Sequence, residues 1–247
     1  IDTDALYPLV FKPVYKEVMW GGNKLETILK RDVPPHCSPI GEAWEIVDRD
    51  DAVSIVENGP LKGETLRKLV EFYGKELIGD HFNGGKFPLL VKIIDAGKRL
   101  SLQVHPDEAA CARTPGIEPK TEMWYIIQAD KGAKIIAGLR NNTTKVRDWG
   151  RVDANGKSRE LHVDAARDCI DFTDRTVPRI SGPCDSTDRN RKYPVVNTCP
   201  FFKVEDLRLV ENWRDNTNST NSFHIITAIN EPVTVGRDDR TVEVKAG

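Results

Sequence analysis

The stretch that decides the fold reads KRLSLQVHPDEAACARTPGIEPKTEMWY and spans residues 98–125. Leucine and valine alternate with polar residues in LSLQVH, and this alternation predicts a strand in which Gln103 and His105 face the same side. Glu122 stands at the start of a second strand-like run, MWYII. If the two strands are neighbours in a barrel, an imidazole and a carboxylate meet inside it, and Gln103 adds an amide oxygen. Such mixed nitrogen and oxygen ligands suit zinc and other first-row ions.

The spacing of these residues leaves other roles open. A histidine beside a proline is more often a packed or capping residue than a metal ligand. Glu122 can equally be a surface acid paired with Lys120, which is two residues away. On residue types alone, ordinary structural roles for His105 and Glu122 are favoured over a metal site.

Composition limits the class of protein. The 247 residues are 39% hydrophobic and 30% charged, which is typical of a globular protein with a sizeable core. A net charge of −2 offers no positive field for a nucleic-acid backbone, so no nucleic-acid partner is expected. No stretch approaches the ~20 apolar residues of a membrane span, and the first residues lack the pattern of a signal peptide, so no membrane association is expected.

The cysteines point to a reducing compartment. There are five of them, an odd number, and none forms a CxxC pair. This pattern argues against a disulfide framework and against a thiolate zinc site. A cytoplasmic protein with free cysteines is expected.

Short β-branched runs between turn residues indicate an all-β sandwich or barrel with helical decoration. Strands are expected at 52–56, 89–94, 100–104, 123–127, 133–136, 201–209 and 223–229. Apolar residues that recur every three or four positions predict helices at 64–77 and at 162–170. Pro106, followed by the acidic residues Asp107 and Glu108, predicts that another helix begins there. The region 173–198 is rich in Pro, Ser, Asp and Arg, and it is expected to be a linker.

Several stretches resemble one protein family in the family's own order. QVHPDE (103–108) and EPKTEMWYI (118–126) resemble the first half of the metal site in type I mannose-6-phosphate isomerases of the shorter, bacterial kind. Further stretches that agree are VMWGGNK (18–24), IGEAWEIV (40–47), FPLLVKIID (87–95) and DWGRVDANGKSRELHV (148–163). Together they cover most of residues 7–172, and the rest resembles a cupin-like β-domain less distinctly.

The resemblance implies both a fold and an activity. The expected fold is mainly β, with a jelly-roll β-barrel of the cupin type and helical decoration over residues 1–172. A linker and a second, incomplete cupin-like β-domain are expected over residues 173–247. The implied activity is a metal-dependent aldose–ketose isomerase that interconverts mannose 6-phosphate and fructose 6-phosphate. One Zn²⁺ per chain and a small-molecule sugar phosphate as partner are expected with it.

By the same resemblance, Gln103, His105 and Glu122 bind the metal and Lys120 lies beside the substrate. Aldose–ketose isomerisation moves a proton between neighbouring carbons through an enediol-like intermediate. A metal can hold and polarise the sugar oxygens on which negative charge develops. A general base must move the proton, and the sequence does not identify it.

Two further cations are candidates for the catalytic set. The segment TTKVRDWGR (143–151) corresponds to a family pattern like TTYRVYDWGR. Lys145 takes the place of the family's arginine, and Arg147 stands where an aromatic residue is usual. Either can supply positive charge, although lysine lacks the bidentate fork that suits phosphate. A solvated loop charge is an equal alternative for each.

One part of the family's metal site has no counterpart. The family's third protein ligand is a histidine in a stretch like PxGTxHA, and the other histidines here stand in different contexts: His36, His81, His162 and His224. In the family, tens of residues separate the pieces that match AGLR (137–140) and NNTTKVRDWGR (141–151), which are adjacent here. A missing segment is therefore expected after about residue 140.

Two other functions stay open. A cupin that binds a sugar phosphate without catalysis would keep the barrel and lose the metal. Convergence of Gln103, His105 and Glu122 favours the enzyme, whereas splayed side chains favour the binding protein. An iron-dependent cupin oxygenase fits less well, because such sites commonly use two histidines and a carboxylate.

Overall fold

The structure is a computed structural model. It describes residues 6–35, 38–114, 116–138, 156–158, 160–170, 172–173, 189–214, 221–237 and 239–246. The chain divides into two compact units, of which unit 1 comprises residues 1–100 and 215–247 and unit 2 comprises residues 101–214. These bounds differ from the expected domains 1–172 and 173–247, which stay a prediction.

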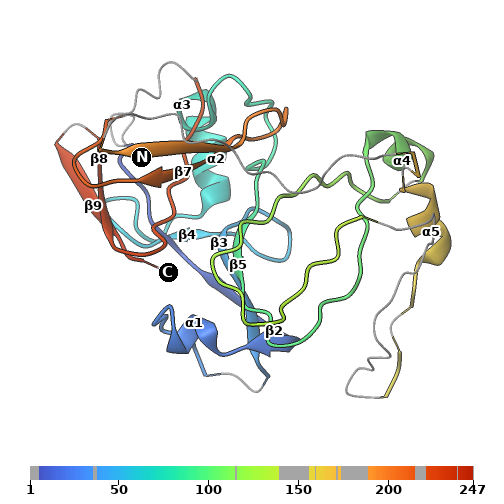
Figure 1. Cartoon of the computed structure of the whole chain (residues 1–247). Helices are drawn as coiled ribbons and strands as arrows, with labels where there is room; N and C mark the ends of the chain where they lie inside the picture. The colour runs from blue at the N-terminus through green and yellow to red at the C-terminus, as the bar shows by residue number, and fades with distance from the viewer. Residues whose placement is uncertain are drawn as a thin grey trace. The chain divides into compact units, whose positions relative to one another are not determined.

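Unit 1 is built on a three-stranded antiparallel sheet with the strand order β2-β3-β5 (Figure 1). Its strands are β2 (Val14–Gly22), β3 (Ile40–Ile46) and β5 (Val91–Ile94). Ala43 in the central strand pairs with Tyr15 on one side and Ile93 on the other, and its side chain is fully buried. Of its three strands, β5 lies inside the expected strand 89–94. The sheet forms one side of the unit's core.

The other strands of unit 1 form antiparallel pairs. β1 (Phe11–Lys12) pairs with β4 (Ile55–Val56), and β8 (Val233–Arg237) pairs with β9 (Arg240–Val244). β4 lies inside the expected strand 52–56. The sequence did not predict the β8–β9 hairpin as such.

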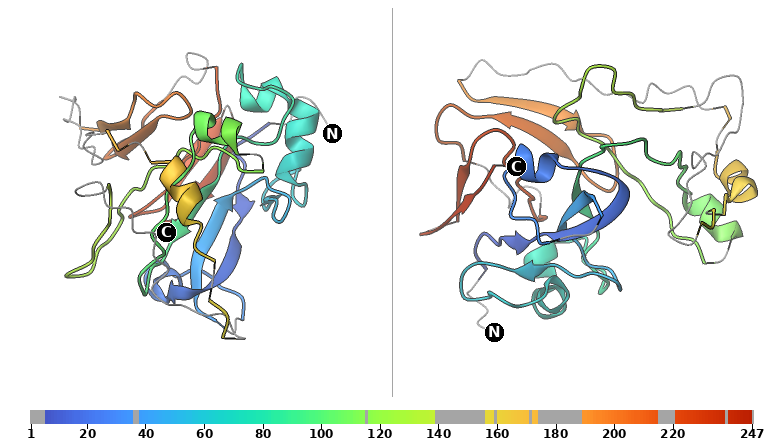
Figure 2. Two further views of the ribbon diagram at one scale, coloured as in Figure 1. Left: turned by 90° about the vertical axis from the view of Figure 1, so that its right-hand side faces the viewer. Right: turned by 90° about the horizontal axis from the view of Figure 1, so that it is seen from below.

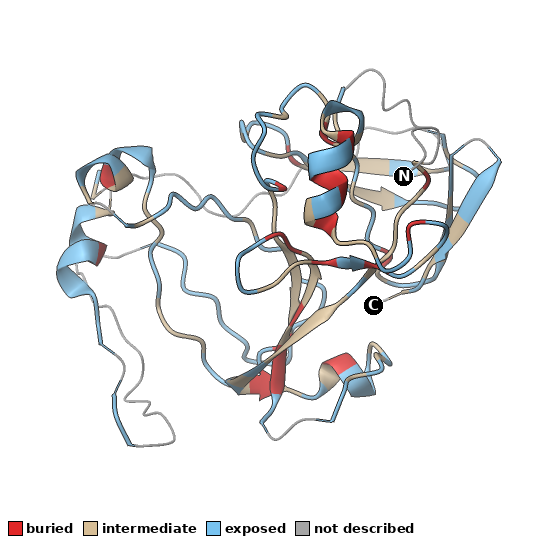
Figure 3. Ribbon diagram, turned by 180° about the vertical axis from the view of Figure 1, so that it is seen from behind, coloured by how far each residue is buried: buried red, intermediate tan, exposed pale blue. Residues whose placement is uncertain are grey.

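The helices of unit 1 are short. They are α1 (Lys24–Thr27), α2 (Leu66–Tyr73) and α3 (Lys75–Ile78). α2 begins after Thr65, whose side chain accepts a hydrogen bond from a backbone N–H of the first turn. Gly74, at a φ of 50°, ends α2, so the helix expected at 64–77 is divided into two. Figure 3 shows the buried side of α2, which carries Leu66, Leu69, Val70 and Tyr73.

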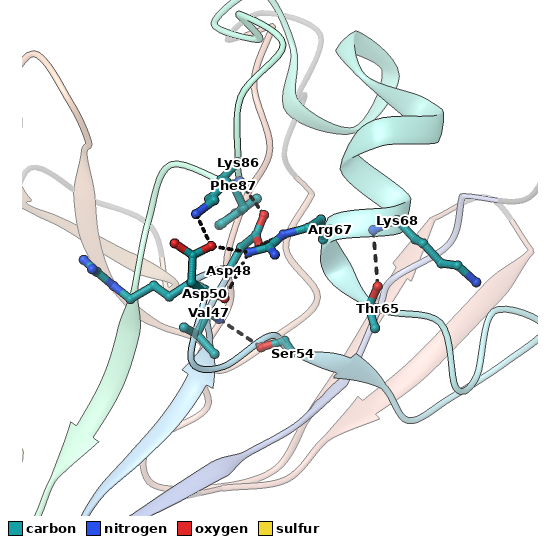
Figure 4. A network of polar contacts seen from close by, with 10 residues as sticks. Val47, Asp48, Asp50, Ser54, Thr65, Arg67, Lys68, Lys86 and Phe87 are labelled. Atoms are coloured by element: carbon teal, nitrogen blue, oxygen red, sulfur yellow. Dashed lines mark hydrogen bonds and ion pairs between the residues drawn. The ribbon is translucent and has the colours of Figure 1, made fainter.

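A buried carboxylate ties α2 to the segment that precedes β5 (Figure 4). Asp48 lies two residues after β3, and its side chain is 0% exposed. Arg67 donates from Nε to Asp48 Oδ1 at 2.8 Å, and its Nη2 lies 2.7 Å from the same oxygen. The backbone N–H of Phe87 donates to Oδ2 at 2.9 Å. One acidic side chain therefore joins three separate segments of unit 1.

The described residues of unit 2 form two short helices and a two-stranded antiparallel sheet. α4 (Glu108–Arg113) begins after Asp107, whose Oδ1 accepts a hydrogen bond from Ala110 N at 2.7 Å. α5 (Val163–Asp168) follows, and β6 (Arg191–Val196) pairs with β7 (Val204–Arg208). The helices expected from Pro106 and at 162–170 are confirmed in shorter form. β6 lies in the region that was expected to be a linker.

Several expected strands do not form. Residues 100–104, 123–127, 133–136 and 223–229 are irregular, apart from an isolated bridge at Leu102. A strand is stable only when its backbone pairs with a neighbour, and alternation in sequence does not supply that neighbour. Six apolar side chains of the expected strands 123–127 and 133–136 stay 42–58% exposed as a result: Trp124, Tyr125, Ile126, Ile127, Ile135 and Ile136.

The expectation of a mainly β protein with few, short helices is confirmed. The helices found in the described ranges are all too short or too polar to cross a bilayer.

Candidate metal centre

The chain folds back on itself between residues 103 and 122. The backbone N–H of Lys120 donates to the carbonyl oxygen of Pro106 at 3.1 Å, so the segment before α4 lies beside the segment after it. α4 occupies the loop between these two segments. His105 immediately precedes Pro106, and Glu122 follows Lys120 by two residues. The backbone therefore brings the two side chains together.

His105 and Glu122 contact one another as the sequence predicted. His105 Nε2 lies 3.0 Å from Glu122 Oε1. The side chains are 23% and 33% exposed, so both are partly shielded from water while they remain accessible. The two halves of the predicted site thus converge even though the strands expected to carry them are irregular.

The Glu122 carboxylate is surrounded by donors. Lys120 Nζ lies 3.1 Å from Oε2, and the indole N–H of Trp124 donates to Oε1 at 3.1 Å. The hydrogen bond from His105, and after it the contacts with Lys120, lower the pKa of Glu122 to about 2, although burial opposes this shift. The carboxylate is therefore ionised at neutral pH, as a metal ligand must be.

The spacing of the pair suits a metal ion. Zinc binds imidazole nitrogen and carboxylate oxygen at about 2.0–2.2 Å, so two ligands of a tetrahedral site stand about 3.3 Å apart. The observed 3.0 Å between His105 Nε2 and Glu122 Oε1 is close to that value. Within the described ranges, no group of three or more His, Cys, Asp and Glu side chains gathers as a metal site. His105 and Glu122 therefore fit as two members of a larger ligand set.

Gln103 has a different partner. Its side-chain amide donates to Ser101 Oγ at 2.8 Å, and the residue is exposed. The contact recorded for Gln103 thus runs along its own segment and not to His105. Its role as a ligand stays a prediction. Lys145 and Arg147 lie outside the described residues, and so does the junction after residue 140.

Three polar contacts were missed by sequence reasoning. Trp124 was assigned only to a strand, although its position two residues after Glu122 is the spacing at which side chains share a face. In unit 1, Glu42 accepts from the indole N–H of Trp44 at 2.6 Å and pairs with Lys92 Nζ at 3.0 Å. The Glu42 and Lys92 side chains are 14% and 25% exposed, so this acid–base pair is largely screened from solvent. The register between β3 and β5 explains the contact of Glu42 with Lys92. This register cannot be read from the sequence of one strand alone.

The backbone and the paired side chains define a β-rich protein in which a histidine and a carboxylate contact each other on either side of α4. Residues 9–137, just over half of the chain, match the family described as phosphomannose isomerase type I, catalytic domain. The chain belongs to this family.

The relatives agree with this assignment. The mannose-6-phosphate isomerase ManA of Bacillus subtilis (strain 168) is 45% identical over 139 residues, which are 56% of this chain and 42% of ManA. The mannose-6-phosphate isomerase of Streptococcus mutans is 42% identical over 131 residues, which are 53% of this chain and 40% of that protein. The chain thus spans less than half the length of these two curated relatives.

Two further comparisons run along almost the whole chain. The Bacillus subtilis protein YvyI is 29% identical over 299 aligned residues, which cover 97% of this chain and 91% of YvyI. Because this alignment is longer than the 247 residues of the chain, part of YvyI stands opposite no residue here. The crystal structure of the mannose 6-phosphate isomerase from Bacillus subtilis superposes with a TM-score of 0.79 at 25% identity, over 98% of this chain and 92% of that chain.

Proposed function

We propose that the chain is a metal-dependent isomerase that interconverts mannose 6-phosphate and fructose 6-phosphate. The observation that supports this most is the contact of His105 with Glu122 at 3.0 Å, inside the region that matches the family. The family is metal-dependent. Our proposal is one Zn²⁺ per chain, a sugar phosphate as substrate and a cytoplasmic location. The proposed fold of the matched region is a barrel of the cupin type.

Each residue of the proposed site has a chemical task. His105, Glu122 and Gln103 would hold the metal, which supplies a Lewis acid for the sugar oxygens. Glu122 contributes a carboxylate that remains ionised because its pKa is about 2. Lys120 places a positive charge 3.1 Å from that carboxylate, where it can attract the anionic substrate or steady developing charge. Lys145 and Arg147 are the further cations proposed for this purpose.

The ligand set needs one more protein ligand. We propose that it comes from a segment that belongs after about residue 140 and is missing from this sequence. The long alignment with YvyI supports such a segment. The same segment would supply strands that complete the barrel.

A coupled isomerase assay on the full-length protein tests the function. Mannose 6-phosphate is compared with other sugar phosphates before and after treatment with a chelator, and zinc is then added back. We expect turnover of mannose 6-phosphate that is lost on chelation and restored by zinc. Activity that survives complete removal of metal would refute the mechanism.

Variants connect the activity to the proposed ligands. His105→Ala and Glu122→Gln are expected to lower both zinc affinity and turnover by at least about tenfold, since each removes one ligand. His162→Ala is the matched control, because His162 is an exposed histidine of the same unit outside the proposed set. Equal loss in all three variants would show that the effect is general to the fold and not specific to the metal.

The second candidate is a protein that binds sugar phosphate without catalysis. The absence of a group of three or more ligands within the described ranges favours it. Calorimetric titration with mannose 6-phosphate after chelation distinguishes the two. Binding that persists without metal, together with no turnover in the presence of zinc, would replace the enzyme with the binding protein.

A further inference from the structure

Two free cysteines lie on neighbouring helices of unit 2. Cys111 is part of α4, and Cys169 directly follows α5 as its C-terminal cap residue. Both thiols are free and half-buried. The two helices lie side by side in the views of Figures 1 and 2. Neither cysteine belongs to the proposed metal site.

A hydrogen bond joins the ends of the two helices. Arg113 Nη2 donates to the carbonyl oxygen of Asp168 at 3.1 Å. Arg113 lies two residues after Cys111, and Asp168 immediately precedes Cys169. The contact therefore draws together the two backbone segments that carry the thiols.

Both helices bury a small side chain. The buried residue of α4 is Ala110, and the buried residue of α5 is Ala166. They are 2% and 7% exposed. An alanine extends only one carbon beyond the backbone, so backbones on either side of it can approach closely. Disulfide formation needs Cα atoms about 4.4–6.8 Å apart, a separation that only closely packed segments reach.

The two thiols influence one another electrostatically. Burial raises the pKa of Cys111, and the neighbouring Cys169 is the next largest cause of that rise. The Cys169 sulfur therefore lies near enough for its charge to act on Cys111.

We propose that Cys111 and Cys169 form a redox-sensitive pair that oxidises to a disulfide and ties α4 to α5. The oxidant is a low-molecular-weight disulfide such as oxidised glutathione. One thiolate attacks the oxidant and forms a mixed disulfide, which releases one reduced thiol. The second cysteine then attacks the mixed disulfide and releases the other. Two protein thiols are thus oxidised to one S–S bond, and the oxidant is reduced to two thiols.

The disulfide would act on the proposed metal site, and this part of the inference rests on the proposed function. α4 lies in the loop that joins His105 to Glu122, and the hydrogen bond from Lys120 N to Pro106 O closes this loop. Fixing α4 against α5 restrains the loop and holds the two ligands in place. We expect oxidation to slow zinc release by at least about fivefold, the lower end of typical coupling between sites.

The experiment uses the full chain with Cys37, Cys184 and Cys199 replaced by serine, so that only the proposed pair remains. After treatment with oxidised glutathione we expect two thiols to disappear and the mass to fall by that of two hydrogen atoms. Peptide mapping should recover a crosslink of Cys111 to Cys169 that a reductant cleaves. Glutathione adducts on both cysteines without a crosslink would overturn the proposal.

Two comparisons keep the test decisive. Cys111→Ser in the same background leaves one thiol, so it should give a single glutathione adduct and no loss of mass. If circular dichroism shows that the triple serine background does not fold, the unmodified chain is oxidised and its crosslinks are mapped directly. In that mapping, a predominant crosslink other than the proposed one would overturn the pair.

The regulatory step has its own measurement. Zinc release from the oxidised and reduced forms is followed with a chromophoric chelator. Equal rates in a protein that does form the crosslink would overturn the regulation and leave the thiol pair in place. A protein that forms the crosslink but binds no zinc in either form would instead count against the proposed function.

Discussion

Replacing Asp48 by asparagine should destabilise the protein substantially, because the buried Asp48 carboxylate joins the segment after β3 to α2 and to the segment before β5. Its side chain is 0% exposed and accepts from Arg67 and from the backbone N–H of Phe87. Removing one partner of a buried ion pair costs about 3–5 kcal/mol. Arg67 is 33% exposed, so water replaces part of the lost contact. We therefore expect Asp48→Asn to lower the free energy of unfolding by about 2–3 kcal/mol.

Urea unfolding followed by circular dichroism measures this change. For a chain of this size, the expected loss corresponds to a fall in Tm of about 5–10 °C. Asp50→Asn is the matched control, because Asp50 is 86% exposed and pairs with Lys86 and Arg67 at the surface. The control should change stability little. If Asp48→Asn were no more destabilising than Asp50→Asn, the buried carboxylate would not be what holds these segments together.

Three further outcomes follow from the structure. Because the pKa of Glu122 is about 2 in the folded chain and 4.5 for an unperturbed glutamate, the stabilising contribution of Glu122 should be complete above pH 4.5 and disappear as the pH falls toward 2. Urea titrations of wild type and Glu122→Gln should therefore differ at pH 6 and converge near pH 2. Gly59→Ala should cost about 2 kcal/mol or more, since a Cβ there would lie 2.4 Å from the Tyr7 ring at a φ of +58°, whereas Gly63→Ala meets nothing within 4 Å and should cost only its backbone strain. Thr65→Ala should lower stability by about 1 kcal/mol in the same assay, and an unchanged midpoint would mean that the cap of α2 contributes nothing.

Local patterns predicted the helices well and the strands poorly. The helix at α2 could be read from its apolar spacing, and α4 from Pro106 and the acidic residues after it. The break at Gly74 was missed, because a glycine that adopts a φ of 50° is identical in sequence to one inside a helix. Strand 123–127 was expected from its composition, yet a strand also needs a partner, and composition carries no information about one.

The candidate site was predicted in part for a comparable reason. The contact of His105 with Glu122 could be predicted from the family resemblance, and the structure brings the two together at 3.0 Å. The sequence analysis expected the pairing of two barrel strands to bring these side chains together. In the structure, a hydrogen bond from the backbone N–H of Lys120 to the carbonyl oxygen of Pro106 brings them together, and the sequence does not indicate this bond. The hydrogen bond from the indole N–H of Trp124 to Glu122 was missed because such contacts depend on side-chain rotamers and not on spacing alone.

The exposed apolar residues of unit 2 bear on the segment that we propose belongs after about residue 140. Six large side chains in segments 124–127 and 135–136 are about half exposed. Full burial of such a side chain stabilises a protein by about 1.5–3 kcal/mol. Because each of the six is about half exposed, together they lack roughly 5–9 kcal/mol of this stabilisation. That amount is comparable to the entire stability of a typical domain, about 5–15 kcal/mol. Isolated exposed apolar residues need no explanation, but runs of strand-forming residues left uncovered do. A segment that paired with 123–127 and 133–136 would recover this free energy, and the alignment with YvyI leaves part of that protein opposite no residue of this chain. If these pairing strands belong to the missing segment, their absence would also explain why, of the proposed ligands in the described ranges, His105 and Glu122 alone contact each other.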